Sequence, residues 1–137
     1  MPKEKEILNA TITGTMLGTE DHGIFTCYIH LSGASWGCSF GGYALDEYQG
    51  TRGKRVGTAY GMRFIMALLH TLKLEKWEEL QGQLVRVESE GLGRGLAKIG
   101  HLIEDRWFDP KQFSAEYKAE AQKGEAPSIL SDGGFSQ

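Results

Sequence analysis

GASWGCSFGGYALDEY, residues 33–48, combines four glycines with Trp36, Phe40 and Tyr43 in one short segment. As a β-strand it would place Trp36, Cys38 and Phe40 on one face, because successive side chains point to opposite faces of a sheet. The other face would carry only serine and glycine, which leaves room for a neighbouring backbone or a ligand. The Gly-Gly pair that follows favours a bulge or a turn with positive φ. The segment therefore predicts either a twisted central strand with a tight exit or a binding surface framed by glycines and aromatic rings.

Two alternating segments precede this stretch. Residues 7–17 alternate apolar side chains with asparagine and threonine, and residues 24–31 place phenylalanine, cysteine, isoleucine and leucine at every second position. A period of two with many β-branched residues is typical of half-buried strands. Short polar turns join these segments to each other and to a strand over residues 33–43. We therefore predict an antiparallel meander of three strands.

Helix signals appear in the second half of the chain. Thr58 suits the N-cap of a helix over residues 59–73, and Asp109 followed by Pro110 is typical of a second helix start. The apolar stripe that we expect on the first helix consists of Ile65, Leu68, Leu69 and Leu72. Between the meander and this helix, the glycine-rich residues 46–57 predict a loop.

The residues between the two helices predict a short helical turn and two strands. The turn covers residues 74–80, and the strands cover residues 84–88 and 96–103, joined by a glycine-rich turn over residues 90–95. Val85 and Val87 are expected to point inward from the first strand. Ala97, Ile99 and Ile103 are expected to share one face of the second.

These elements predict an α+β fold. Its sheet would be mostly antiparallel with about five strands, made of the meander and a C-terminal hairpin, and the helices would lie on one side. We expect one domain over residues 1–123. Residues 124–137 are rich in glycine and serine and predict a mobile tail.

Composition limits the classes of function. The 137 residues are 40% hydrophobic and 24% charged with a net charge of −3, whereas general nucleic-acid binders carry a basic excess. No apolar run approaches the roughly 20 residues that span a bilayer. Two cysteines make no disulfide framework, and no signal peptide is visible, so we expect a reducing, cytoplasmic setting.

Two glycine-rich segments carry cations. Residues 50–57, GTRGKRVG, place Arg52, Lys54 and Arg55 before a helix N-terminus, where backbone amides and the helix dipole favour a phosphate. This is no Walker A loop, because an arginine rather than serine or threonine follows the lysine. A solvated basic loop is the alternative. Arg94 in GLGRG would sit at a turn tip, within reach of a phosphate or a partner subunit.

The segment EDRWFD, residues 104–109, sets Arg106 beside Trp107 and Phe108. Arginine binds phosphates through two hydrogen bonds, and aromatic rings stack on bases. The alternative is structural: the two aromatic rings would cover the sheet edge, and the arginine would pair with a local carboxylate. The residues alone leave both interpretations open.

The sequence offers few residues that are suited to catalysis or to metal binding. The four histidines are far apart in sequence, and Cys27 and His30 would point to opposite faces of one strand, so we expect no metal site and no cofactor. Both cysteines fall on apolar strand faces, where thiols are usually inert. The turn around His22 holds Glu20 and Asp21 but no visible nucleophile, so we expect no catalytic residues and a protein that is not an enzyme.

Three segments resemble a known group of phage proteins. LGTEDHGIFTCYIHLSG (residues 17–33), SWGCSFGGYALDEY (35–48) and KIGHLIEDRWFD (98–109) are similar to the phage anti-Thoeris sponge family, over roughly residues 7–113. Those proteins sequester cyclic ADP-ribose-type immune signals without degrading them. The resemblance implies a homo-oligomer in the host cytoplasm, with signal pockets of aromatic and arginine side chains between protomers. It also implies that some members bind cyclic oligonucleotides at separate sites.

The residues of this chain that match such a pocket chemistry are Arg94, His101, Arg106 and Trp107, followed by Phe40, Tyr43 and Arg55. Two rival functions stay open. A phage protein–protein inhibitor or structural interaction protein would use the aromatic surface and bind no small molecule. A nucleotide hydrolase or cyclase would depend on His22, His101 or a carboxylate.

Overall fold

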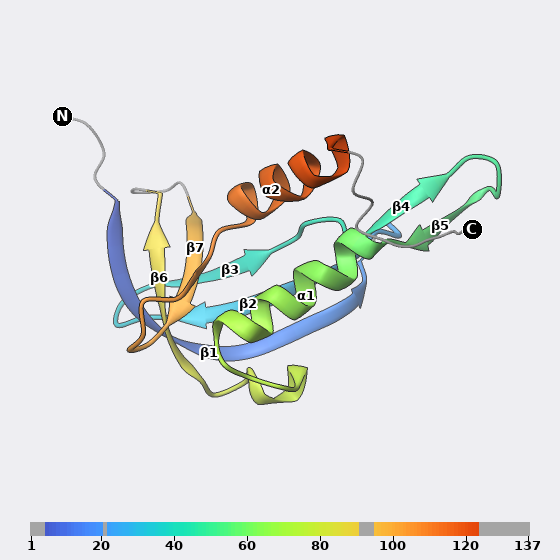
Figure 1. The fold of residues 1–137 in the computed structure, drawn as a ribbon. Helices are drawn as coiled ribbons and strands as arrows, with labels where there is room; N and C mark the ends of the chain where they lie inside the picture. Colours follow the sequence, from blue (N-terminus) through green and yellow to red (C-terminus); the bar gives the residue numbers. More distant parts are fainter. Residues whose placement is uncertain (1–4, 21, 91–94, 124–137) are drawn as a thin grey trace.

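The computed structural model describes residues 5–20, 22–90 and 95–123. Its main element is an antiparallel sheet of six strands in the order β3-β2-β1-β6-β7-β8, all of which except β8 are labelled in Figure 1. The strands are β1 (Glu6–Thr19), β2 (Phe25–Ser32), β3 (Gly37–Gly41), β6 (Leu84–Ser89), β7 (Leu96–His101) and β8 (Trp107–Phe108). The predicted meander is β1-β2-β3, and the predicted C-terminal hairpin is β6-β7. The α+β prediction is confirmed.

The glycine pair at the end of β3, of which Gly41 is the last residue, behaves as predicted. Gly41 has φ +134° and Gly42 has φ +88°, a backbone region that side chains rarely adopt. A Cβ on Gly41 would also lie 2.2 Å from the carbonyl oxygen of Cys27 in β2. The strand is shorter than the predicted residues 33–43, because β3 begins only at Gly37.

Residues 46–57 form a hairpin rather than the predicted loop. β4 (Asp46–Gln49) pairs antiparallel with β5 (Lys54–Gly57), and the hairpin projects away from the main sheet (Figure 1). Tyr48 is 60% exposed, so neither strand buries a regular apolar face. The period-two signal that identifies half-buried strands is therefore absent from this sequence.

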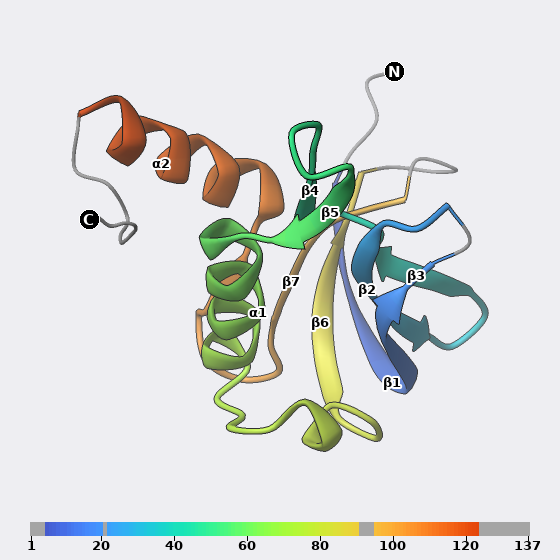
Figure 2. The same ribbon diagram turned by 90° about the vertical axis from the view of Figure 1, so that its right-hand side faces the viewer.

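Both predicted helix starts are confirmed. In α1 (Ala59–Thr71) the Thr58 hydroxyl accepts a hydrogen bond from the amide of Gly61, at 2.9 Å. In α2 (Pro110–Gln122) the Asp109 carboxylate accepts from the second and third amides of the helix. Figure 2 shows both helices on the same side of the sheet. The helical turn after α1 is a short 3₁₀ segment, Trp77–Glu79. Among the described helices, none is long and apolar enough to cross a membrane.

The core lies between α1 and the inner face of the sheet. Val85 and Val87 point inward as predicted, and so do Leu68 of α1 and Leu72, the residue that caps its C-terminus. The predicted stripe of α1 missed Phe64, which is fully buried. The buried apolar side chains of the core are Ala10, Ile12, Cys27, Ile29, Leu31, Phe40, Leu45, Phe64, Leu68, Leu72, Leu80, Val85, Val87, Ile99 and Phe108.

The end of β7 differs from the prediction. The strand stops at His101, and Ile103, which was expected inside, is 81% exposed. A tight turn follows, in which the His101 amide donates to the carbonyl of Arg106 at 3.0 Å. The chain then adds the two-residue strand β8 at the sheet edge. A strand this short is too brief to produce a sequence period.

Candidate functional site

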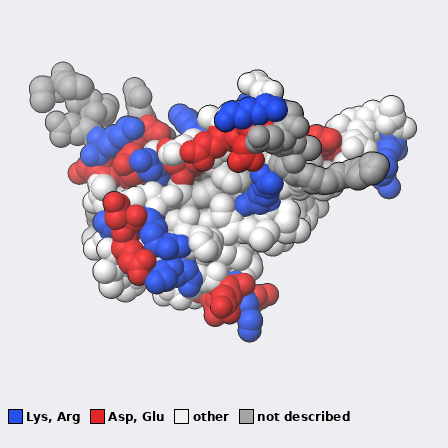
Figure 3. Space-filling model, viewed as in Figure 1, with Lys and Arg blue, Asp and Glu red and all other residues white. Residues whose placement is uncertain are grey.

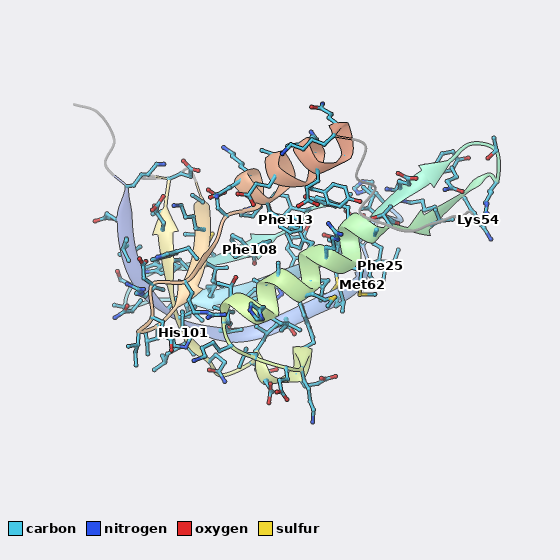
Figure 4. The ribbon with its side chains drawn as sticks, in the orientation of Figure 1. Phe25, Lys54, Met62, His101, Phe108 and Phe113 are labelled. Atoms are coloured by element: carbon cyan, nitrogen blue, oxygen red, sulfur yellow. The ribbon has the colours of Figure 1, made fainter. Side chains whose placement is uncertain are left out.

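The candidate ligand-binding residues that follow from the resemblance do not lie together in the structure. His101, Arg106 and Trp107 lie together at the turn between β7 and β8. Arg55 lies in the β4–β5 hairpin, and Figure 4 shows Lys54 of that hairpin at the opposite end of the molecule from His101. Phe40 and Tyr43 lie near the core. The remaining candidate, Arg94, falls outside the described residues.

Arg106 closes the end of α1. Its Nε donates to the carbonyl of Thr71 at 3.1 Å, and its Nη2 donates to the carbonyl of His70. The last carbonyls of a helix have no partner within the helix and carry partial negative charge, so a guanidinium there is favourable. The Nη1 atom of Arg106 lies 4.0 Å from the Oε1 atom of Glu104. Arg106 therefore contacts groups of its own chain, as in the structural alternative, but its main partners are backbone carbonyls rather than a carboxylate.

Replacing Arg106 with alanine is expected to lower the free energy of unfolding by about 1–3 kcal/mol, because charge-assisted hydrogen bonds to the end of α1 are lost. Urea unfolding followed by circular dichroism measures the change. Arg52→Ala is the matched control, since Arg52 is exposed at the hairpin turn. An unchanged stability, together with weaker ligand binding, would instead favour a phosphate contact.

Trp107 and His101 are also held by contacts within the chain. The Trp107 ring packs against Gly100, where a Cβ would lie 2.6 Å from the ring. The Arg86 guanidinium lies over the ring, 4.9 Å from its centroid, and this cation–π contact uses the ring surface that a base would need. The Nδ1 atom of His101 accepts from the backbone amides of residues 103 and 104, at 3.2 and 3.0 Å. These contacts stabilise the turn.

Arg55 forms a two-point ion pair with Asp46 across the hairpin. Its Nε and Nη2 donate to the two carboxylate oxygens at 2.9 and 3.0 Å, the strong bidentate geometry. The Asp46 side chain is only 8% exposed and also accepts from the Phe25 amide at 3.1 Å. The hydrogen bonds from Arg55, with a smaller share from the Phe25 amide, lower the pKa of Asp46.

The Asp46–Arg55 pair predicts a pH dependence of stability. Because the folded-state pKa of Asp46 is lowered, its contribution is complete above the unfolded value of about 3.9 and is lost as the pH falls through the folded value. We expect Asp46→Asn to be clearly less stable than the natural protein at about pH 6, and this difference to shrink towards about pH 3. Urea unfolding at both pH values measures it. A difference that stays constant with pH would contradict the assignment.

Phe40 and Tyr43 differ in accessibility. Phe40 is 3% exposed and belongs to the core, so its ring is not available to a ligand in this structure. Tyr43 is 37% exposed and packs on Phe64 with ring centroids 5.6 Å apart. Burial, followed by the nearby charge of Asp109, raises the pKa of the Tyr43 phenol. The Tyr43 hydroxyl therefore stays protonated at neutral pH.

A cavity of about 440 Å³ lies between the β4–β5 hairpin, the start of α1 and α2. We call it the α2 cavity. Its lining residues are Ala44, Asp46, Glu47, Thr58, Tyr60, Ser114, Tyr117 and Lys118. The α2 residues are more than 50 positions from the others in sequence, so no local motif predicts the cavity. The only signal was the recurrence of Phe113, Tyr117 and Ala121 along the predicted second helix.

The walls of the α2 cavity combine aromatic and polar groups. The rings of Tyr60 and Tyr117 meet edge to face, 5.1 Å apart, and the Tyr60 hydroxyl shares a hydrogen bond with the hydroxyl of Ser114. The Arg63 guanidinium lies 5.6 Å from the centroid of the Tyr117 ring. Lys118 is exposed and has no hydrogen bond or ion pair to any described residue. These groups suit a small ligand with a flat ring and polar edges.

Charge at the α2 cavity is mixed. Glu47 and Asp46 line one side and Lys118 another, and the Asp46 charge is already paired with Arg55. Figure 3 shows acidic and basic side chains interspersed on the face that carries the helices. A carboxylate beside a flat-ring site can accept hydrogen bonds from sugar hydroxyls, as in dinucleotide sites. The cavity therefore suits a nucleoside-like ligand better than a bare polyphosphate.

Reactive groups are few in the described part of the chain. It contains no group of three or more histidine, cysteine, aspartate or glutamate side chains placed to hold a metal ion. Burial raises the pKa of the Cys27 thiol to about 11, so this thiol is not a nucleophile at neutral pH.

Comparison with known proteins identified no relative of this chain. Family models, curated proteins and solved structures were searched, and none of them matches this chain.

Proposed function

We propose that this protein binds a nucleotide-derived signal and holds it without changing it, as a phage anti-defence protein. The observation that carries the proposal is the α2 cavity, in which two tyrosine rings, hydroxyl groups and Lys118 surround a space of about 440 Å³. Pockets for small molecules usually measure about 300–1,000 Å³ and combine aromatic walls with a few polar groups. The resemblance supplies the ligand class, a cyclic ADP-ribose-type signal or a cyclic oligonucleotide.

Sequestration requires affinity alone. One base stacked on a tyrosine contributes about 1–3 kcal/mol, and charge-assisted hydrogen bonds contribute about 1.5–3 kcal/mol each. Nanomolar binding needs about −12 kcal/mol, so several such contacts must act in a preformed pocket. In the proposed homo-oligomer of the host cytoplasm, a second protomer would add contacts to the exposed Lys118 side of the cavity.

Thermal unfolding with a ligand panel tests the proposal. The panel consists of cyclic ADP-ribose isomers and cyclic di- and trinucleotides. A ligand present at about 100 times its Kd adds about 2.7 kcal/mol, which raises the Tm by several degrees. The bound ligand should be recovered unchanged after heat denaturation. A chemically altered ligand would favour the hydrolase or cyclase instead.

Tyr117→Ala is expected to weaken ligand binding about tenfold or more, because one aromatic wall of the α2 cavity is removed. Isothermal titration with the ligand that raises the Tm measures the change. Tyr48→Ala is the matched control, since Tyr48 is 60% exposed on the hairpin and does not line the cavity. Equal affinity in Tyr117→Ala and the natural protein would place the ligand elsewhere.

A second candidate function, a protein–protein inhibitor, is favoured by an apolar groove beside α1. The groove is lined by Leu17, Phe25, Leu45, Gly57, Thr58, Gly61, Met62 and Ile65. Met62 is 63% exposed and Phe25 is 39% exposed, and Figure 4 shows these two side chains next to each other. Exposed methionines adapt to many partner surfaces. Under this alternative, Met62→Glu abolishes the anti-defence activity, and no ligand of the panel raises the Tm.

A further inference from the structure

Two aromatic rings stand side by side on the open face of the sheet. In β2 the side chains of Ile29 and Leu31 are buried under the helices, so Tyr28 and His30 point to the opposite face. Figure 2 shows that both helices lie on the other side of the sheet. His30 is exposed and Tyr28 is half-buried. Their ring centroids are 6.4 Å apart, and the ring planes differ by only 4°.

The contacts of His30 show which way the rings face. Its Nδ1 lies 2.8 Å from the Ser39 hydroxyl on β3, and its Cδ2 lies 3.7 Å from the position of a Cβ on Gly14 of β1. Nδ1 and Cδ2 flank the same ring carbon, so the imidazole plane runs across the strands. The flat face of the ring therefore points along β2, towards Tyr28. Because the Tyr28 ring is parallel to it, the two rings face each other across a slot.

The width of the slot is close to that of one flat ring. Carbon atoms in contact are about 3.5 Å apart, so a ring held between two others needs about 7 Å between the outer planes. Alternate residues of a strand repeat at about 6.8 Å, which sets the natural spacing of upright side chains. The observed separation of the ring centroids, 6.4 Å, is shorter than this, so both side chains would have to rotate slightly apart to admit a ring.

Glycines keep the flanks of the slot free. Gly14 faces His30 from β1, and Gly41 faces Tyr28 from β3. Met16 is opposite Tyr28 in β1, but its sulfur lies beside Gly18, 3.8 Å from the position of a Cβ there and away from His30. The sequence had predicted a face poor in side chains at residues 33–48, and this slot lies beside it.

We propose that the slot between Tyr28 and His30 binds a purine base, sandwiched between the two rings. A purine has two flat faces and offers each ring a large stacking surface. The slot lies on the opposite side of the sheet from the α2 cavity, so this binding does not rest on the function proposed above. The Ser39 hydroxyl, beside the His30 ring, is placed to meet the polar edge of the base, whereas the Tyr28 hydroxyl lies against Gly42, 3.2 Å from the position of a Cβ there.

Titration of the full chain with adenosine monophosphate tests the slot. We expect the ring protons of His30 to shift upfield in NMR spectra, because the base stacks on the imidazole face. The double variant Tyr28→Ala/His30→Ala should bind at least about tenfold more weakly. The matched control is Tyr48→Ala/His22→Ala, which removes an exposed tyrosine and an exposed histidine outside the slot and should bind as the natural protein does.

A second variant keeps both rings and blocks access. Gly14 has room for a Cβ at an ordinary contact distance, so Gly14→Val should fold, and its side chain would stand beside His30 and reduce binding. Ribose 5-phosphate, which lacks the base, should not bind in the slot. Unshifted His30 protons, or equal affinity in the double variant, would overturn the proposal. Equal binding of ribose 5-phosphate would do the same, since it would assign the recognition to the phosphate.

Discussion

Phe64→Ala is expected to lower the free energy of unfolding by about 3–5 kcal/mol, the usual cost of removing a fully buried aromatic ring. Phe64 is 0% exposed and lies at the centre of an aromatic cluster. Its ring centroid is 4.9 Å from that of Phe108 in β8 and 5.8 Å from that of Phe113 in α2. Figure 4 shows these two partners beneath α2. The cavity left behind would be lined by side chains of α1, β8 and α2, and we expect these three elements not to collapse into it.

Urea unfolding of Phe64→Ala measures this cost. Met66→Ala is the matched control on the same helix, because Met66 is 61% exposed, and its loss should change stability by no more than about 0.5 kcal/mol. Since Phe64 also contacts Tyr60, which lines the α2 cavity, the variant should also bind the ligand that we propose for this cavity more weakly. A loss below about 1 kcal/mol would mean that the cluster repacks around the missing ring.

Gly61→Ala is expected to lower the free energy of unfolding by about 3 kcal/mol, although alanine is the better helix former by about 1 kcal/mol. A Cβ on Gly61 would lie 2.0 Å from the carbonyl oxygen of Leu45. That carbonyl cannot move freely, because it accepts from the Thr58 hydroxyl at 3.1 Å, and the Leu45 amide donates to the Phe25 carbonyl at 2.9 Å. The steric cost therefore exceeds the gain in helix propensity.

Differential scanning calorimetry compares Gly61→Ala with Gly57→Ala. Gly57 lies four residues earlier and has open space around its Cβ position, so its substitution should change stability by no more than about 0.5 kcal/mol. A higher Tm for Gly61→Ala would contradict the close contact between α1 and the Leu45 carbonyl. The position would then be governed by helix propensity alone.

Local patterns in the sequence were sufficient for most of the main sheet and both helix starts. The meander and the β6–β7 pair follow from a period of two, because one face of each strand is buried. Thr58 and Asp109 identified the helix starts, because a capping side chain bonds to amides only two or three residues away. The glycine pair at the end of β3 was likewise a local requirement of the backbone.

Where a residue's contact partner is distant in sequence, its role could be assigned only from the folded structure. The hairpin at residues 46–57 buries no regular face, so its sequence shows no alternation of apolar and polar residues. β8 is too short to show such an alternation. Arginine and tryptophan suit a phosphate, a base, a helix end or another side chain equally well. The fold brought the end of α1 to Arg106 and Arg86 to Trp107, and it built the α2 cavity and the Tyr28–His30 slot from separate strands and helices. Local sequence patterns were enough to predict which strand faces are buried and where the helices begin, since both depend on neighbouring residues. The use of each exposed ring and charge depends on what packs against it, and that was settled only in three dimensions.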